Sequence, residues 1–529
     1  MFELRPDIRV QVQSNTRPVI VDCVEGTRAV VDPLVLEVLR ALDGAPSLED
    51  AWQVLERRGL ADGLDRDGFG EFVEASLSRY FATPTHAAAS LRQAWGEARR
   101  VREERLLALV RWAGAKVPYY QARWGHLLPE LRGIEDARRI PLLSREEVRA
   151  QFPTGLLAAG FDYGELISSG RAAVEYSSGS TSVTDRVPSL HLVSELGPSA
   201  VSSVPFFSRT DRAADFTPPV CSGHECSIEQ QSREERTFGG YLLLPSAPDP
   251  MYMSEAALRG VHAELWDWAP QALLGNPWYL MSLLRSFDAL GLPLPDSIEV
   301  VQTLTEFATA PVRRYLARKT GLVPFDGYSS TECGTLAVTC PLGRYHLAEQ
   351  SYVEILRRGR PAGVGEFGEI VVTTLDNEAM PLVRYRQRDL AAPTESCECG
   401  IPSPTIELLG RQGDCLVAGS RVVPVRVVDR GLERVAALLF YRLLQQADET
   451  VGADIGVDPE SGASAETVVA DVRRVLAECD LKVGAVTVVE RLRTQPSMKF
   501  SPLVSRVPQL RQRVAQALEL EDDASSPAL

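Results

Sequence analysis

The stretch GEIVVTTLDNEAMPLVRYRQRDL, residues 368–390, is the segment from which the fold of this chain can be worked out. It opens with β-branched apolar residues, which is the pattern of a buried strand, and then leads into Arg384, Arg386 and Asp389. A second segment, LLGRQGD (residues 408–414), brings further charges to the point where the composition of the chain changes. The order of these segments carries more information than any one of them alone.

Apolar runs typical of strands alternate with helical patterns before this stretch. The runs are ALLGN (272–276), SIEVVQTLT (297–305) and GLVPFDGY (321–328). Such alternation predicts an α/β core. After about residue 412 strands and helices mix over a short length, which predicts a small α+β domain.

The N-terminal part of the chain has a pattern of its own. Short strand-like runs and three helical segments fill residues 1–83, TPTHAAAS (83–90) is typical of a linker, and residues 91–152 have helical spacing. We therefore predict three domains, at residues 1–83, 84–411 and 412–529, with a disordered tail at the end of the last one.

Composition excludes several classes of protein. The 529 residues contain 56 Lys and Arg against 71 Asp and Glu, a net charge of −15, which argues against a sequence-independent nucleic-acid binder. We find neither a signal pattern nor an apolar run of about 18 residues, so we expect a cytoplasmic protein without membrane contact. Nine cysteines in so long a chain are better tested against metal binding than against a disulfide framework.

A hydroxyl- and glycine-rich segment precedes this core. Its side chains and flexible backbone amides could wrap an anion, although an ordinary structural turn has the same composition. The segment comprises Ser177, Ser178, Gly179, Ser180 and Thr181.

Four longer phrases carry a resemblance to a known family. They are AKVPYYQARWG (115–125), IPLLSREEVRAQFP (140–153), AMPLVRYRQRDL (379–390) and CECGIPSPTIELLGRQGD (397–414). Over about residues 90–510 the chain resembles the adenylate-forming superfamily, and within it the phenylacetate–CoA ligase-like branch. The resemblance implies a large α/β domain, a small mobile α+β domain, and the use of ATP with Mg²⁺.

The resemblance also implies roles for single residues around the nucleotide. Tyr328 in GYSSTECG would stack on adenine, and Asp389 would accept hydrogen bonds from the ribose hydroxyls. Thr331 and Glu332 would meet phosphate and magnesium. The other implied nucleotide contacts are Arg411, Thr305 and Glu306, the last two being a weaker match.

Two further roles concern movement and catalysis. Asp414 would mark the hinge about which the small domain rotates. Lys499 in QPSMKFSP fits the lysine that reaches the carboxylate and the α-phosphate, where a cation stabilises developing negative charge. The alternative for Lys499 is a solvated lysine without a role in catalysis.

The serine-rich segment departs from the family pattern of Gly-Lys-Pro after the hydroxyl residues. Ser182 stands at the glycine position, and Arg186 is the nearby cation that would replace the lysine. Arginine and lysine are not interchangeable, but departing phosphates chiefly need a neutralising charge. We therefore expect a modified loop, with the efficiency of ATP use in doubt.

Cysteine and histidine spacing predicts a metal site. Cys340 and His346 form one pair and Cys397 and Cys399 another, and together they would make a Cys3His zinc site. Some relatives in this branch carry such a cluster, which supports a structural role; the alternative is unrelated half-buried thiols. For CSGHEC (221–226) we prefer a loop or acyl-pocket role over a metal site.

The remaining candidates are weaker. Trp278 and Tyr279 in GNPWYL would line the pocket for the carboxylate substrate or pack in the core. The four other histidines outside CSGHEC have no motif around them, so a Ser-His-Asp hydrolase cannot be argued. They are His86, His126, His191 and His262.

Residues 1–83 resemble the small winged-helix peptide-recognition domain typified by the pyrroloquinoline-quinone peptide chaperone. In that family a leader segment of a ribosomally made precursor peptide adds as a strand beside the sheet and packs on a helix. The alternative is an accessory dimerisation or regulatory domain.

The combined prediction is a tailoring enzyme of ribosomally made peptides. It would adenylate a carboxylate, either on the bound peptide or on a small acid, and then transfer the acyl group to an amine or a thiol, including coenzyme A. Our preference is the peptide's own carboxylate, because tethering raises its effective concentration. The rivals are a free-standing aryl- or acyl-CoA ligase and a non-catalytic peptide-binding scaffold with a decayed nucleotide pocket. The oligomeric state is left open, with a homodimer among the options.

Overall fold

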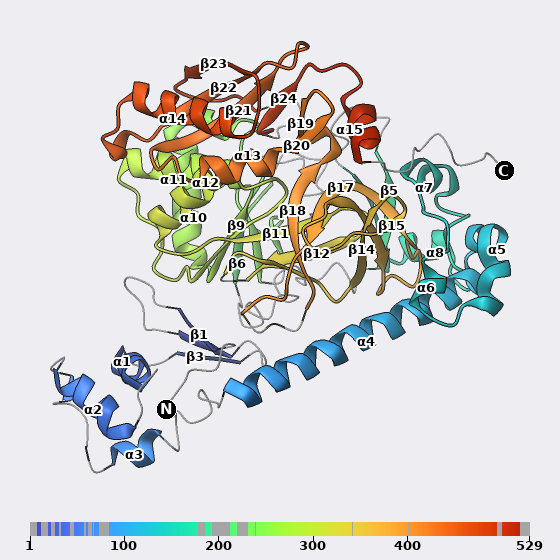
Figure 1. Cartoon of the computed structure of the whole chain (residues 1–529), viewed down its shortest axis with the longest axis horizontal. Coiled ribbons are helices and arrows are strands. Elements are labelled where there is room, and N and C mark those ends of the chain that lie inside the picture. The colour runs from blue at the N-terminus through green and yellow to red at the C-terminus, as the bar shows by residue number, and fades with distance from the viewer. Residues whose placement is uncertain are drawn as a thin grey trace.

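The computed structural model describes most of the chain, and all structural statements below concern this part. The described residues are 8–11, 19–22, 27–30, 33–42, 47–57, 60–61, 66, 68–73, 84–177, 186–192, 212–218, 231–238, 240–340, 342–399, 401, 403–494 and 500–518. Figure 1 shows a small N-terminal part at one end of a long helix, a central region built on a large sheet, and a C-terminal part lying against that region.

The N-terminal part is an antiparallel three-stranded sheet followed by three helices. Its strands are β1 (Ile8–Gln11), β2 (Val19–Asp22) and β3 (Thr27–Val30), with β2 in the middle. Its helices are α1 (Pro33–Leu42), α2 (Leu48–Arg57) and α3 (Phe69–Phe72). Apolar faces of these helices form a separate small core in which Trp52 contacts Phe69 edge-on, with ring centroids 5.1 Å apart.

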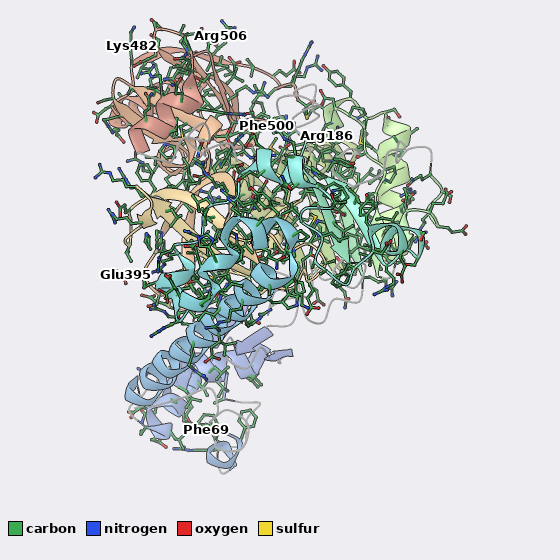
Figure 2. All side chains as sticks on the ribbon, turned by 90° about the vertical axis from the view of Figure 1, so that its right-hand side faces the viewer. Phe69, Arg186, Glu395, Lys482, Phe500 and Arg506 are labelled. Atoms are coloured by element: carbon green, nitrogen blue, oxygen red, sulfur yellow. The ribbon has the colours of Figure 1, made fainter. Side chains whose placement is uncertain are left out.

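Helix α4 (Pro84–Lys116) joins this part to the rest of the molecule. The sequence predicted a linker over residues 83–90, and for residues 84–90 this is wrong, because they form the first turns of α4. Pro84 suits the first turn of a helix, and the alanine run that follows has the highest helix propensity. Figure 2, which labels Phe69 and Phe500, shows the N-terminal and C-terminal parts at opposite ends of the view.

A thirteen-stranded sheet dominates the central region. Its order is β15-β14-β16-β17-β18-β13-β12-β11-β10-β9-β6-β8-β7. Strands β11, β10, β9, β6 and β8 run parallel, and the strands from β11 through β12 to β15 pair antiparallel. The bounds are β6 (Ala213–Phe216), β7 (Thr237–Phe238), β8 (Tyr241–Leu243), β9 (Ala272–Gly275), β10 (Val300–Thr303), β11 (Phe325–Ser330), β12 (Gly334–Thr339), β13 (Tyr345–Leu347), β14 (Ser351–Arg357), β15 (Arg360–Pro361), β16 (Gly368–Thr374), β17 (Tyr385–Pro393) and β18 (Thr405–Arg411).

Helices pack against both the parallel half and the antiparallel half of this sheet. Side chains of α10, α11 and α12 pack in one core with strands of the parallel half, whereas α4 to α8 pack in another core with the antiparallel half. The helices are α5 (Pro118–Trp124), α6 (Ile134–Ala137), α7 (Arg145–Gln151), α8 (Tyr163–Ser168), α10 (Glu255–Trp268), α11 (Pro277–Leu290) and α12 (Ala310–Thr320). A separate hairpin, β4 (Ala172–Tyr176) with β5 (Pro188–Leu192), lies beside them.

The arginines of the opening stretch form buried ion pairs in the antiparallel half of the sheet. Arg384 Nε lies 3.0 Å from Glu354 Oε2, and Arg386 Nη2 lies 2.7 Å from Glu369 Oε2. All four side chains are buried, so each charge depends on its partner. Asp389, by contrast, points to a different set of residues.

The C-terminal part consists of a hairpin, a four-stranded sheet and three helices. The hairpin is β19 (Cys415–Ala418) with β20 (Arg421–Pro424), and the sheet has the order β23-β22-β21-β24. Its strands are β21 (Leu438–Gln445), β22 (Val451–Val457), β23 (Val483–Val488) and β24 (Leu503–Ser505), and its helices are α13 (Val425–Leu432), α14 (Ala465–Glu478) and α15 (Leu510–Leu518). The predicted α/β fold with a smaller α+β part is thereby confirmed.

A buried polar contact joins the C-terminal part to the central region. Asp429 of α13 is fully buried, and its Oδ1 accepts hydrogen bonds of 2.8 Å from the amide of Ala310 and from the hydroxyl of Tyr441. Asp429 thus caps the first turn of α12 from another part of the chain. No helix in the described ranges is long and apolar enough to cross a membrane.

Candidate functional site

Strands β11, β17 and β18 of the large sheet bring the predicted adenosine-binding residues together. The Tyr328 hydroxyl of β11 donates a 2.7 Å hydrogen bond to Asp389 Oδ2 of β17. Asp389 is paired in register with Arg411 of β18, whose Nε lies 3.5 Å from Asp389 Oδ1. The three residues, more than 80 positions apart from first to last, therefore form one connected group.

Burial controls the charges of this group. Burial raises the pKa of Asp389, while the Arg411 charge and the Tyr328 hydrogen bond act in the opposite direction. Burial and the adjacent Asp389 carboxylate raise the pKa of Tyr328 well above its usual value, so the phenol remains a donor. The group contains a carboxylate acceptor and an aromatic ring, both of which occur in nucleoside sites, and Tyr328 and Asp389 each keep 8% of their surface exposed.

A second group of residues surrounds Glu332. Its Oε1 accepts a 2.9 Å hydrogen bond from the Tyr385 hydroxyl and lies 3.5 Å from Arg145 Nη2. Arg145 Nη2 also donates a 3.2 Å hydrogen bond to Ser177 Oγ, at the start of the serine-rich segment. The carboxylate of Glu332 is near enough to raise the pKa of Asp389, which places both groups in one electrostatic cluster.

Sequence reasoning missed Arg145. The residue occupies the first turn of α7, where Ser144 forms a capping box: Ser144 Oγ accepts from the amide of Glu147, and Glu147 accepts from the amide of Ser144. The cap fixes the start of the helix and hence the position of Arg145. The phrase IPLLSREEVRAQFP contained a signal for this residue, because Arg145 directly follows Ser144, a typical helix-capping serine.

The hairpin β4–β5 holds the base of the serine-rich segment. Ser177 Oγ accepts a 2.8 Å hydrogen bond from the amide of Val187, which closes the hairpin. The carbonyl of Thr331 lies 2.8 Å from His191 Nε2, so β5 also supports the segment that carries Glu332. Arg186, the residue before Val187, is exposed. Outside the described residues lie Ser178, Gly179, Ser180, Thr181 and Ser182.

The loop after β10 contacts the C-terminal part. Thr305 has a positive φ of 71° and accepts a 3.1 Å hydrogen bond from Asn276 Nδ2. Both carboxylate oxygens of Glu306 lie 3.1 Å from the backbone amide of Phe500. Lys499 is outside the described residues, but Phe500, its neighbour, is at this loop. Asp414 is the last residue of the short helical turn that follows β18 (Gln412–Asp414) and accepts a 3.3 Å hydrogen bond from the amide of Arg411.

Trp278 and Tyr279 are both fully buried. The Trp278 ring stacks on Phe500 and meets Phe440 edge-on, and the Tyr279 hydroxyl donates to the carbonyl of Pro248 at 2.8 Å. In this arrangement the two rings pack against protein. The structure thus favours the core-packing interpretation over a substrate-pocket role.

The four predicted metal ligands converge. Cys340, His346, Cys397 and Cys399 place one ligand atom each within 4.8 Å of all the others. Cys340 Sγ lies 3.7 Å from Cys397 Sγ, and Cys399 Sγ lies 3.2 Å from His346 Nε2. Hydrogen bonds from Cys340 and Cys399 lower the pKa of Cys397, which favours a thiolate in the cluster.

The donor set fits a tetrahedral zinc ion. Zn–S and Zn–N bonds of about 2.3 and 2.0 Å place ligand atoms about 3.5 to 3.8 Å apart. The cluster is mostly buried, and His346 Nδ1 is without a hydrogen-bond partner in the described part of the chain. Cys221, His224 and Cys226 lie outside that part.

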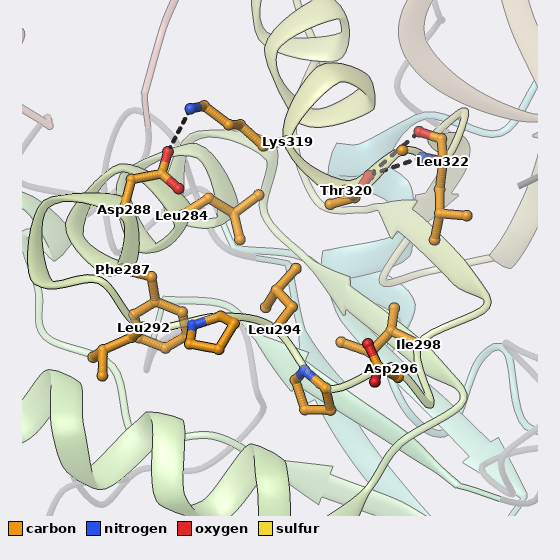
Figure 3. A pocket seen from close by; sticks show the side chains of 13 residues that line it. Leu284, Phe287, Asp288, Leu292, Leu294, Asp296, Ile298, Lys319, Thr320 and Leu322 are labelled. Carbon is orange, nitrogen blue, oxygen red and sulfur yellow. Dashed lines mark hydrogen bonds and ion pairs between the residues drawn. The ribbon is translucent and has the colours of Figure 1, made fainter. Parts of the chain in front are cut away.

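A cavity of about 310 Å³ lies elsewhere in the central region. Figure 3 shows the side chains that line it. It is lined by the C-terminal turns of α11 and α12, and Lys319 Nζ lies 2.8 Å from Asp288 Oδ2 at its edge. Ile298 and Leu322 line it just before β10 and β11 begin, whereas Thr305 and Tyr328 lie near the other ends of these strands. The cavity is therefore separate from the candidate nucleotide site.

Comparison with known proteins supports an assignment of the fold. No protein-family model matches the chain. The chain is 28% identical over 356 residues to a phenylacetate–coenzyme A ligase of Thermus thermophilus, covering 62% of this chain and 74% of that one. It is 23% identical to a phenylacetate–coenzyme A ligase of Aromatoleum evansii, covering 69% of this chain and 83% of the relative.

Among solved structures, the chain is similar to 2-hydroxyisobutyryl-CoA ligase in the postadenylation state with R3-HIB-AMP. The TM-score is 0.60 at 15% identity, and the match covers 84% of this chain and 95% of that structure. The chain thus has the fold of adenylate-forming ligases, and the sequence relatives it matches are phenylacetate–coenzyme A ligases.

Proposed function

We propose that the protein activates a carboxylate with ATP as an acyl-adenylate and acts on a ribosomally made precursor peptide held by its N-terminal part. The convergence of Tyr328, Asp389 and Arg411 beside the Glu332–Arg145–Ser177 group carries the first half of this proposal. One group suits a nucleoside, and the other offers hydroxyl and cationic groups to phosphates.

The residues divide the work as follows. Tyr328 stacks on adenine, Asp389 accepts from the ribose hydroxyls, and Glu332 would hold Mg²⁺, which neutralises phosphate charge when bound. Arg145 and Arg186 supply positive charge near the departing pyrophosphate. Lys499 stabilises the charge that builds up as the carboxylate attacks the α-phosphorus.

The N-terminal sheet supports the peptide part of the proposal. Strands β1 and β3 are its two edges within the described residues, and an edge strand offers backbone groups to which an extended peptide can pair. The separate core of this part, far along α4, fits a recognition module attached to an enzyme. A tethered peptide carboxylate would then reach the site at a high effective concentration.

The likeness to phenylacetate–coenzyme A ligases favours a second candidate, a free-standing acyl-CoA ligase. Both candidates share the adenylation step and differ in the acid and in the nucleophile. In the first, an amine or a thiol attacks the acyl-adenylate of the peptide, or of a small acid to be joined to the peptide. In the second, the thiol of coenzyme A attacks the acyl-adenylate of a small acid.

Zinc would have a structural role. Cys340 follows β12, and Cys397 and Cys399 lie in the turn between β17 and β18, so one ion would tie together the ends of the two hairpins whose strands carry Tyr328, Asp389 and Arg411. The ion would fix their relative positions and take no part in the reaction.

Acid-dependent formation of AMP by the full-length protein tests the proposal. The acids are phenylacetate, a panel of aryl and aliphatic acids, and any short peptide encoded beside the gene, and mass spectrometry identifies the acylated product. AMP formation that requires the peptide supports the tailoring role. Formation of a CoA thioester from a small acid alone supports the second candidate. If the protein binds a fluorescent peptide but forms no AMP with any acid, only the role of a non-catalytic peptide-binding scaffold remains.

A further inference from the structure

Two residues of the central region, Trp278 and Glu306, hold Phe500 in place. Its ring lies flat on Trp278, with centroids 4.4 Å apart and planes 7° from parallel. Its backbone amide faces both oxygens of the Glu306 carboxylate at 3.1 Å. A stacked aromatic pair and a charge-assisted hydrogen bond are each specific in geometry, so Phe500 has one defined position.

The two anchoring residues are themselves coupled. Asn276 is fully buried; its Oδ1 accepts from the amide of Trp278 at 2.9 Å, and its Nδ2 donates to Thr305 at 3.1 Å. The positive φ of Thr305 is rare for a non-glycine residue and turns the chain so that Glu306 faces Phe500. A single amide side chain thus fixes the start of α11 and the loop after β10 relative to each other.

The C-terminal part holds the other side of Phe500. The Arg442 guanidinium lies over the Phe500 ring, 4.8 Å from its centroid. Its Nε donates to the carbonyl of Ser501 at 3.2 Å, and its Nη2 donates to the carbonyl of Arg493 at 2.6 Å. Arg442 therefore joins the chain on both sides of residues 494–500.

The loop that carries Glu306 contacts the strand that carries Tyr328. A Cβ added at Gly327 would come within 2.8 Å of Leu304 Cδ2, so the loop after β10 touches the residue next to Tyr328. Consecutive Cα atoms are about 3.8 Å apart, so whatever fixes Phe500 also restricts the position of Lys499.

We infer that Glu306 and Trp278 are positioning residues that dock Phe500 and thereby present Lys499 for the adenylation step. This rests on the proposed function, in which Lys499 acts on the carboxylate and the α-phosphate. Glu306 then contacts the C-terminal part and not the nucleotide, and Trp278 contacts Phe500 and not the acyl group. Rotation of the C-terminal part after adenylation would have to break both contacts, which makes them specific to the first half-reaction.

The test compares Trp278→Ala, Trp278→Phe and Glu306→Ala with the wild type, using Tyr279→Phe as a buried control on the same helix. The assay is ATP–pyrophosphate exchange with phenylacetate or the peptide as the acid. We expect kcat to fall by about 10- to 100-fold in the two alanine variants, since misplacing a catalytic group by about 1 Å costs up to about 10²-fold. KM for ATP should stay unchanged, and Trp278→Phe should retain most of the activity because it keeps a stacking ring.

Hydrogen exchange measured without ATP gives an independent readout. The Phe500 amide should be protected in the wild type and exchange faster in Glu306→Ala and Trp278→Ala. A rise in KM for ATP in Glu306→Ala at unchanged kcat would assign Glu306 to the nucleotide and overturn the inference, as would unchanged exchange of the Phe500 amide. A third outcome combines the two readouts. If the substitutions reduce protection of the Phe500 amide but the wild-type protein shows no pyrophosphate exchange, the proposed function and the catalytic consequence are refuted. The docking contact itself would then still be supported.

Discussion

The adenosine side and the phosphate side of the site take their residues from different kinds of elements. Tyr328, Asp389 and Arg411 lie on strands of one sheet, and hydrogen-bonded register sets their positions. Ser177 and Arg145 come from the end of a hairpin and the first turn of a helix. A sheet fixes side chains through many backbone contacts, whereas a loop depends on a few, so substitutions accumulate more readily on the phosphate side.

This difference agrees with the departures from the family pattern. The adenosine side keeps the expected residue types, while the serine-rich segment has Ser182 and Arg186 in place of glycine and lysine. Arg145, held by Glu332 and Ser177, is a cation from outside that segment. The charge needed by a triphosphate can therefore be supplied by a different element.

The largest effect is expected from Arg145→Ala. Removing a donor that stabilises charge in the transition state costs about 10²–10³-fold in rate. We expect a loss of that size in kcat/KM for pyrophosphate exchange, with partial activity in Arg145→Lys. Arg149→Ala, on the same helix and paired with exposed Glu146, is the matched control. Equal activity of the two alanine variants would show that the phosphate side does not use Arg145.

Asp389→Asn should act on the adenosine side alone. A hydrogen bond to a charged group contributes about 1.5–3 kcal/mol, so KM for ATP should rise about 10- to 100-fold with little change in kcat. Because burial raises the pKa of Asp389, its carboxylate protonates at a higher pH than an exposed aspartate. The affinity for ATP should thus weaken as the pH falls through this raised pKa, and the asparagine variant should lack that pH dependence.

Cys399→Ser tests whether a metal ion supports the adenosine side. We expect about one zinc ion per wild-type chain by elemental analysis, and its loss in the variant together with a lower Tm. KM for ATP should rise about tenfold, since mispositioning of the hairpins would weaken contacts worth about 1.4 kcal/mol. Cys479→Ser, outside the cluster, should bind zinc as the wild type does. The assignment would be contradicted if the wild-type protein contained no metal and had the same Tm as the Cys399→Ser variant.

Tyr328→Phe should have the smallest effect. The ring remains and only the hydrogen bond to Asp389 is lost. Because this bond acts on ATP only through the position of the carboxylate, we expect KM for ATP to rise about fivefold, equivalent to about 1 kcal/mol. An effect as large as that of Asp389→Asn would mean that the hydroxyl orients the carboxylate.

Much of the fold followed from the sequence because the strands are strongly patterned. The runs at 272–276, 297–305 and 368–375 became β9, β10 and β16, and the four metal-ligand candidates met as their spacing suggested. Arg384 and Arg386 lie close to Asp389 in the sequence, yet they form buried ion pairs with Glu354 and Glu369, partners that only strand pairing could identify.

Other features depend on contacts between distant segments. The link between Arg145 and Glu332 spans α7 and the end of β11, and the anchoring of Phe500 joins the C-terminal part to α11. No local pattern encodes these contacts. The linker prediction at residues 84–90 failed for a local reason, because the alanine run favoured continuation of a helix.

ATP–pyrophosphate exchange by the wild-type protein tests the central claim most directly. The protein, MgATP and labelled pyrophosphate are combined with each acid of the panel and with the peptide, and label in ATP is counted. The account predicts exchange that depends on an acid or the peptide and is abolished or greatly weakened in Lys499→Ala. A folded protein that binds ATP but shows no exchange with any of these acids, or exchange that Lys499→Ala leaves unchanged, would contradict it.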